Sequence, residues 1–121
     1  MSKPRILVTR QIFPEVIERL SQHFDVESNQ DDVLWSDAEL AERLKDKDGA
    51  LTTGTQPINA ALLAACPQLK IVSNMTVGYN NFDVNAMTAA GVQGTNTPDV
   101  LTETTADLGF ALLMATARRV T

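Results

Sequence analysis

Apolar and polar positions change in blocks along this chain, and the blocks predict strands that alternate with helices. Residues 5–9 are a short apolar run containing β-branched side chains, which is typical of a buried strand. After Pro14, apolar residues recur at helical spacing as far as Phe24. Further strands are predicted around Val26 and over residues 49–52, 69–73 and 92–95.

The predicted helices have clear start and stop signals. Ser36 and Glu39 have the spacing of a capping box, and Trp35 and Leu40 flank it as a hydrophobic staple. This helix is predicted to run to about Lys47. The remaining signals are two N-caps and two terminators, namely Asn59, Asp83, Pro67 and Gly91.

Strands that alternate with helices predict a flavodoxin-like α/β fold, a doubly wound parallel sheet with helices on both faces. In such sheets, ligands bind outside the carboxyl ends of the strands. Three predicted loops follow strands at that edge: residues 53–56, 74–81 and 96–101. We therefore expect the functional site there.

The last predicted helix, residues 106–117, has only Asp107 and Thr116 as polar residues. A helix that is apolar nearly all round is expected to be buried. It is too short to span a bilayer, which takes about 20 residues. We expect further protein to cover it, so that these 121 residues are part of a longer polypeptide. A homodimer packed on this helix is the alternative.

Composition narrows the class of protein. The formal net charge is −5 and the basic residues are scattered, which argues against nucleic acid or an anionic membrane as a partner. No apolar stretch is long enough to span a membrane, and residues 1–10 do not resemble a signal peptide, so a cytoplasmic location is expected. The single cysteine, Cys66, is expected to be buried rather than nucleophilic. No metal ligands are assigned.

The sequence VGYNNFD, residues 77–83, is the first candidate for chemistry. Gly78 lets the backbone N–H groups of Val77 and Gly78 approach a ligand, and successive N–H groups in such a turn can bind a carboxylate. The segment could equally be a plain turn, with Tyr79 and Phe82 at the edge of the core. Residues 52–55 have the same two interpretations, and the residue types alone leave both open.

Two segments together carry a family resemblance. NMTVGYNNFDVNAMTAAGV at 74–92, followed by NTPDVLTETTADLGFALLMATARR at 96–119, resembles the N-terminal region of the D-isomer-specific 2-hydroxyacid dehydrogenases, most of all the glyoxylate/hydroxypyruvate reductase branch. The resemblance implies a flavodoxin-like substrate domain over residues 1–99. It also implies that residues 100–121 begin an interdomain helix, which leads to a nucleotide-binding domain absent from this chain.

The resemblance further implies an activity and a site. Such enzymes reduce a small 2-keto acid to the D-2-hydroxy acid with NADH or NADPH. The amides of Val77 and Gly78 would hold the substrate carboxylate, with Gly54 beside them. Leu101 would line the cleft between substrate and nicotinamide. Thr105 would contact the nicotinamide end of the cofactor, act as a helix cap, or do both.

The arginine, glutamate and histidine that perform catalysis in the family have no counterpart in these residues. His23, the only histidine, lies near the end of the first predicted helix and is expected to be exposed. The G-x-G-x-x-G turn that binds the pyrophosphate is also absent. We therefore expect no catalytic residue in this chain, no activity of the chain alone, and a homodimer for the full-length protein.

Two other classes with this fold fit less well. Receiver domains need acidic residues after the first strand and an aspartate after the third, where this chain has residues 9–11 (Thr-Arg-Gln) and 52–54 (Thr-Thr-Gly). A flavodoxin needs a hydroxyl- and glycine-rich phosphate loop after the first strand, where residues 10–14 have neither property. A stand-alone interaction module that dimerises through its last helix remains open.

Overall fold

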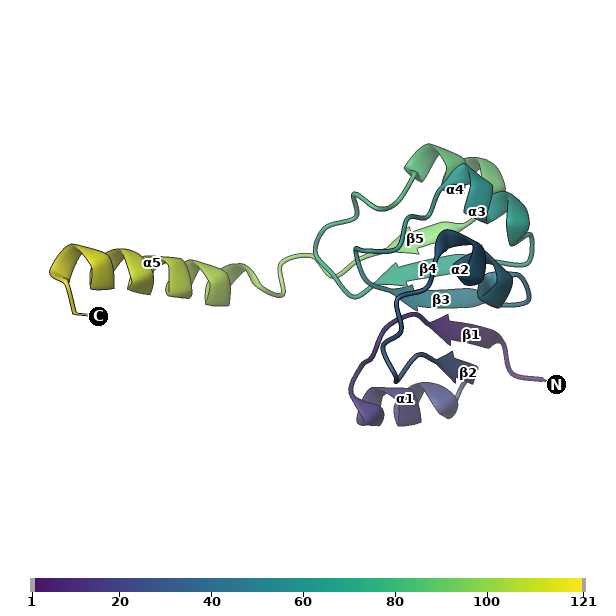
Figure 1. Cartoon of the computed structure of the whole chain (residues 1–121), viewed down its shortest axis with the longest axis horizontal. Coiled ribbons are helices and arrows are strands. Elements are labelled where there is room, and N and C mark those ends of the chain that lie inside the picture. Colours follow the sequence, from purple (N-terminus) through teal and green to yellow (C-terminus); the bar gives the residue numbers. More distant parts are fainter. Residues whose placement is uncertain (1, 121) are drawn as a thin grey trace.

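A five-stranded parallel sheet carries helices on both faces, and a long helix leaves one end of it (Figure 1). This computed structural model describes residues 2–120. The strand order is β2-β1-β3-β4-β5, the flavodoxin-like order, so the predicted fold class of the sheet is confirmed. The elements are β1 (Arg5–Val8), α1 (Pro14–Ser21), β2 (Asp25–Ser28), α2 (Asp37–Leu44), β3 (Gly49–Thr52), α3 (Ala60–Ala65), β4 (Ile71–Asn74), α4 (Val84–Ala90), β5 (Gln93–Thr95) and α5 (Thr102–Arg118).

The core lies between the sheet and the helices α2, α3 and α4, while α1 covers the other face (Figure 1). Leu7, Ala50 and Val72 stand opposite one another on β1, β3 and β4, and all three are buried. Side chains that alternate along a strand point to opposite faces, so this row faces the three helices. The helices contribute Leu40, Leu44, Leu62, Leu63 and Met87 to the same cluster.

The local helix signals are confirmed. Ser36 and Glu39 form both hydrogen bonds of the capping box. Asn59 and Asp83 each accept a hydrogen bond from a backbone N–H of the first turn, and Gly91 ends α4 with a φ of 70°. These contacts involve residues close in sequence, which is why the sequence reveals them.

Some element boundaries differ from the prediction. Helix α2 ends at Leu44 rather than Lys47, since the chain turns there to begin β3. Strand β4 covers Ile71–Asn74 because each of its residues pairs with one of Gly49–Thr52 in β3. The extent of a strand is set by its neighbours in the sheet, which the sequence of one strand does not contain.

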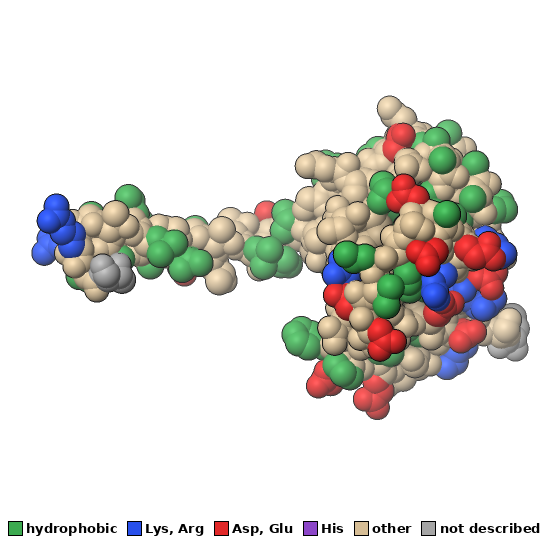
Figure 2. Space-filling model, in the orientation of Figure 1, with side chains coloured by type: hydrophobic (Ala, Val, Ile, Leu, Met, Phe, Trp, Pro, Cys, Tyr) green, Lys and Arg blue, Asp and Glu red, His purple; other side chains and the backbone are tan. Residues whose placement is uncertain are grey.

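Helix α5 differs most from its prediction. It begins at Thr102 rather than Ala106, and all its residues are exposed except the half-buried Ala115. Figure 2 shows its apolar side chains spread along a projecting rod. No part of residues 2–120 buries this helix, because backbone hydrogen bonds form a helix whereas burial needs a packing partner. The expectation that further protein covers it stays a prediction. Within residues 2–120, no helix is long and apolar enough to cross a membrane.

Candidate functional site

The loops that follow β3, β4 and β5 lie at the carboxyl edge of the sheet, the edge from which α5 departs (Figure 1). Two of them touch: a methyl group added at Gly54 would lie 3.7 Å from Oγ1 of Thr76. Thr76 immediately precedes Val77 and Gly78. The structure therefore brings together three of the predicted site residues, Gly54, Val77 and Gly78.

Hydrogen bonds from the loop after β5 orient the two candidate amides. The backbone N–H of Thr97 donates to the carbonyl of Thr76 at 3.0 Å, and Nδ2 of Asn96 donates to the carbonyl of Val77 at 2.7 Å. In a planar trans peptide the N–H points opposite to the carbonyl of the same unit. The N–H groups of Val77 and Gly78 therefore both point away from residues 96–97.

These two N–H groups are available to a ligand. Neither donates a hydrogen bond to another residue in the part of the chain that the structure describes, and Val77 and Gly78 are exposed. A Cβ at Gly78 would meet nothing within 4 Å, and its backbone is not left-handed, so the fold does not require glycine there. Adjacent N–H groups on one side of a turn form a concavity suited to a carboxylate.

A network of neutral side chains, the buried Thr52 and Asn74 and the half-buried Asn81, lies beneath these loops. Oγ1 of Thr52 donates to Oδ1 of Asn74 at 2.6 Å, and Nδ2 of Asn74 donates to Oδ1 of Asn81 at 2.8 Å. Nδ2 of Asn81 then donates to the backbone carbonyl of Gln56 at 2.9 Å. The network links the end of β3 and the loop after it to the loop after β4.

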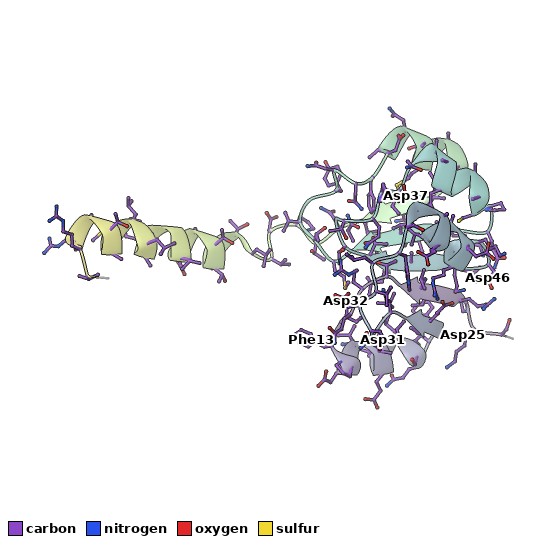
Figure 3. The ribbon with its side chains drawn as sticks, viewed as in Figure 1. Phe13, Asp25, Asp31, Asp32, Asp37 and Asp46 are labelled. Carbon is purple, nitrogen blue, oxygen red and sulfur yellow. The ribbon has the colours of Figure 1, made fainter. Side chains whose placement is uncertain are left out.

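The ionic groups near this edge neutralise one another. Nε and Nη2 of Arg10 donate to the two carboxylate oxygens of Asp32, at 2.6 Å and 2.8 Å. These bonds, with one from the N–H of Gln11, hold the pKa of Asp32 well below its usual range. Figure 3 places Asp32 and Phe13 at this end of the sheet. Arg10 is thus engaged, and the candidate site consists of neutral dipoles.

Two cavities flank the candidate site. One of about 490 Å³ lies between α4 and β5 and includes Tyr79 and Asn96. Another of about 540 Å³ is formed by apolar side chains that include Phe13, Val16 and Met75. The second lies at the carboxyl edge, whereas the first runs along β5 from Val92 to Asn96 and reaches that edge only at Tyr79 and Asn96.

The structure also places the other residues named in the sequence predictions. Leu101 precedes the first residue of α5 and is 57% exposed. Thr105 lies inside that helix, its N–H bonded to the carbonyl of Leu101, so the interpretation of Thr105 as a helix cap is wrong. The roles of both residues toward substrate and cofactor stay predictions. His23 is exposed, and burial raises the pKa of the Cys66 thiol, as expected for an unreactive side chain.

Four residues position the loops through hydrogen bonds, a role that was not predicted for any of them. These are Thr52, Asn74, Asn81 and Asn96. One signal was present, because Thr52 and Asn74 are polar residues at the ends of two otherwise largely apolar strands. Their pairing across the sheet required the register. Among residues 2–120, no group of His, Cys, Asp and Glu side chains could hold a metal ion.

Comparison with known proteins identifies the family. The catalytic domain of the D-isomer specific 2-hydroxyacid dehydrogenases matches residues 6–120. The chain belongs to this family. A glyoxylate reductase from Korarchaeum cryptofilum is 47% identical to it over 118 residues, which cover 98% of this chain and 36% of that protein. The family resemblance seen in residues 74–92 and 96–119 is therefore confirmed.

Solved structures agree with the family and the fold. A 2-hydroxyacid dehydrogenase from Ketogulonicigenium vulgare matches with a TM-score of 0.78 and 36% identity, over 99% of this chain and 37% of that one. An NADPH-dependent glyoxylate/hydroxypyruvate reductase from Sinorhizobium meliloti, solved with NADP and malonate, matches with a TM-score of 0.74 and 38% identity, over 95% of this chain and 34% of that one. The chain spans about a third of the length of these relatives.

Proposed function

We propose that this chain is the substrate domain of an NAD(P)H-dependent reductase that converts a small 2-keto acid, such as glyoxylate or hydroxypyruvate, to the D-2-hydroxy acid. The observation that carries the proposal is the pair of free, similarly directed amides of Val77 and Gly78. The 47% identity to a glyoxylate reductase agrees with a small 2-keto acid as substrate. We place the enzyme in the cytoplasm, where the free thiol of Cys66 is stable.

In this proposal residues 1–99 are the substrate domain and residues 100–121 begin the interdomain helix. The exposed apolar side chains of α5 support it, since a nucleotide-binding domain that follows them would bury them. The full-length protein is proposed to be a homodimer, formed mainly through that second domain. The exposed apolar side chains of α5 that the second domain would bury include Leu108, Phe110, Leu112 and Leu113.

The site residues have distinct proposed roles. The amides of Val77 and Gly78 bind the carboxylate, Gly54 leaves room beside them, and the keto group is thereby oriented toward the cleft. A bound nicotinamide supplies the hydride for the keto carbon. Leu101 lines the cleft and Thr105, exposed in the first turn of α5, contacts the nicotinamide end. The pyrophosphate of NAD or NADP is assigned to the second domain, because this sequence contains no G-x-G-x-x-G turn.

The proposal is tested by the oxidation of NADH or NADPH with glyoxylate and hydroxypyruvate. We expect turnover by the full-length protein and none by the 121-residue chain, which lacks the catalytic arginine, glutamate and histidine of the family. Turnover by the chain alone, or none by the full-length protein, contradicts the proposal.

A glycine pair sharpens this test. Gly78→Val adds a side chain where the fold has free space, so the melting temperature should stay unchanged. KM should rise by about tenfold or more, because the added side chain obstructs the amides that bind the carboxylate. Gly91→Ala is the control, because its positive φ of 70° makes alanine unfavourable by about 1 kcal/mol without contact with the amides. An unchanged KM in Gly78→Val would argue against carboxylate binding at this turn.

A stand-alone interaction module that dimerises through α5 is the second candidate. The same exposed apolar side chains of α5 favour it. A stable homodimer of the 121-residue chain, together with no reductase activity of the full-length protein, would favour this function over the first.

A further inference from the structure

The hydrogen-bond network beneath the site connects the loop after β3 to the loop after β4. Asn81 lies in the loop after β4, and its Nδ2 donates to the carbonyl of Gln56 in the loop after β3 at 2.9 Å. The same nitrogen lies 3.4 Å from the carbonyl of Thr53. These two carbonyls lie on either side of Gly54 in sequence. One amide side chain thus holds the Gly54 loop against the loop that contains Val77 and Gly78.

The network also fixes the course of the chain just after the two amides. The carbonyl of Gly78 accepts hydrogen bonds from Nδ2 of Asn74 at 3.3 Å and from Oγ1 of Thr76 at 2.8 Å. Nδ2 of Asn74 is oriented for this contact because its Oδ1 accepts from Oγ1 of Thr52 at 2.6 Å. Thr52 and Asn74 are 0% and 2% exposed, so neither is free to exchange its partners for water.

Stability alone does not explain polar residues at these strand ends. The row of buried polar residues continues at Thr9, just beyond β1, which is 1% exposed and whose Oγ1 lies 3.3 Å from the carbonyl of Leu51 and 3.2 Å from Oε1 of Gln56. A buried amide or hydroxyl adds little net stability once its hydrogen bonds replace those to water. Its main contribution is a fixed orientation of the groups it bonds, since a hydrogen-bonded network allows far fewer arrangements than an apolar contact. A binding site built from backbone amides depends on such a fixed orientation of its N–H groups.

We propose that Thr52, Asn74 and Asn81 are positioning residues that set the place of the Gly54 loop relative to the Val77 and Gly78 amides. They thereby determine the affinity of the enzyme for the substrate carboxylate. This inference rests on the proposed function, and none of the three side chains contacts the substrate itself.

The test is steady-state reduction of glyoxylate by the full-length enzyme carrying Asn81→Leu. Leucine has a similar volume and no charge, so it removes the hydrogen bonds without repelling the substrate. We expect KM to rise by about tenfold and kcat to stay within about threefold, because the carboxylate is bound in both the ground state and the transition state. A melting temperature that falls while KM is unchanged would overturn the inference.

Asn29→Leu is the matched control. Nδ2 of Asn29 also donates to two backbone carbonyls, those of Thr9 and Val33, at 3.0 and 2.8 Å. It is 5% exposed and directly follows β2, the edge strand that β1 and β3 separate from β4 and the Val77 and Gly78 amides. This variant should lose stability and keep the KM of the unmodified enzyme. A rise in its KM equal to that of Asn81→Leu would also overturn the inference.

A second pair of variants separates orientation from packing. Thr52→Val keeps the shape and removes the hydroxyl that orients Asn74, and should raise KM by about threefold. Thr52→Ser keeps the hydroxyl and should retain the original KM. Equal KM values in the two variants overturn the inference. If the unmodified full-length enzyme does not reduce glyoxylate or hydroxypyruvate, the proposed function fails, and the positioning role is rejected with it.

Discussion

The carboxyl and amino ends of the sheet are held together by different kinds of polar groups. Beneath the candidate loops at the carboxyl end, the connecting groups are neutral side chains, the buried Thr52 and Asn74 and the half-buried Asn81. At the amino end the polar groups are ion pairs, in which the Lys47 side chain is buried and its carboxylate partners are half-exposed. Figure 2 shows charged side chains gathered on the side away from α5. Figure 3 places Asp25 and Asp46 at that end. The ion pairs there include Arg5 with Asp25 and Asp46, Lys47 with Glu27 and Asp46, Arg43 with Glu27, and Lys70 with Asp48.

The difference teaches how a fold can separate stability from binding. Carboxylates at the amino end are satisfied by nearby cations, and they lie far from the amides of Val77 and Gly78. A free carboxylate beside those amides would repel an anionic substrate. Neutral amides and hydroxyls give the carboxyl end its fixed geometry without adding a charge that competes with the ligand.

The largest expected effect comes from a charge placed in the neutral network. Asn74→Asp replaces a donor that bonds Asn81 and Gly78 with a buried carboxylate, which should lower the free energy of unfolding by about 3 kcal/mol near pH 7. Burial raises the folded-state pKa of this new carboxyl above its ordinary value of about 4. The loss is therefore smallest below about pH 4 and grows as pH rises toward the folded-state pKa.

Urea unfolding of this variant near pH 4 and near pH 7 measures the effect. Asn59→Asp is the matched control, because its side chain accepts a hydrogen bond from the N–H of Leu62 at a helix N-terminus, where a carboxylate is favourable. We expect that control to differ little from the unmodified protein. A stable Asn74→Asp variant near pH 7 would show that the carboxyl end tolerates charge.

A substitution at the amino end is expected to cause a smaller loss of stability. The Lys47 side chain is 4% exposed and its Nζ lies 2.6 Å from Asp46 and 3.0 Å from Glu27. Lys47→Met should lower the free energy of unfolding by about 1–2 kcal/mol, since the partners are half-exposed and regain water. KM of the full-length enzyme should not change. The control is Lys45→Met, at an exposed lysine, and its melting temperature should not change. A changed KM in Lys47→Met would show that the amino and carboxyl ends of the sheet are coupled.

The smallest expected effect is a change in acid stability. Asp48 accepts hydrogen bonds from the N–H of Arg5 at 2.9 Å and from Nζ of Lys70 at 3.2 Å, which lower its pKa below the ordinary 3.8. Its contribution is therefore present above the ordinary value and is lost as pH falls through the folded-state pKa. Asp48→Asn should flatten the fall in melting temperature below about pH 4. Asp31→Asn, exposed at the opposite end (Figure 3), should keep the original profile.

Much of the fold could be predicted because its signals are local. The capping box at Ser36, the N-caps Asn59 and Asp83, and the C-cap Gly91 each depend on residues within a few positions. The candidate loops could be placed as well, because parallel strands direct their carboxyl ends to one edge. The role of Asn81 could not be predicted, since its partner Gln56 is far away in sequence.

The sequence by itself determined the alternation of strands and helices, the edge of the sheet at which the candidate loops lie, and membership of the family. Only the tertiary structure decided which loops touch, which way the Val77 and Gly78 amides face, and that α5 has no packing partner within residues 2–120. The physical reason is range. Caps and periodicity are encoded within a few residues, whereas loop orientation depends on hydrogen bonds such as that from Asn96 to Val77, which form only after the strands are in register.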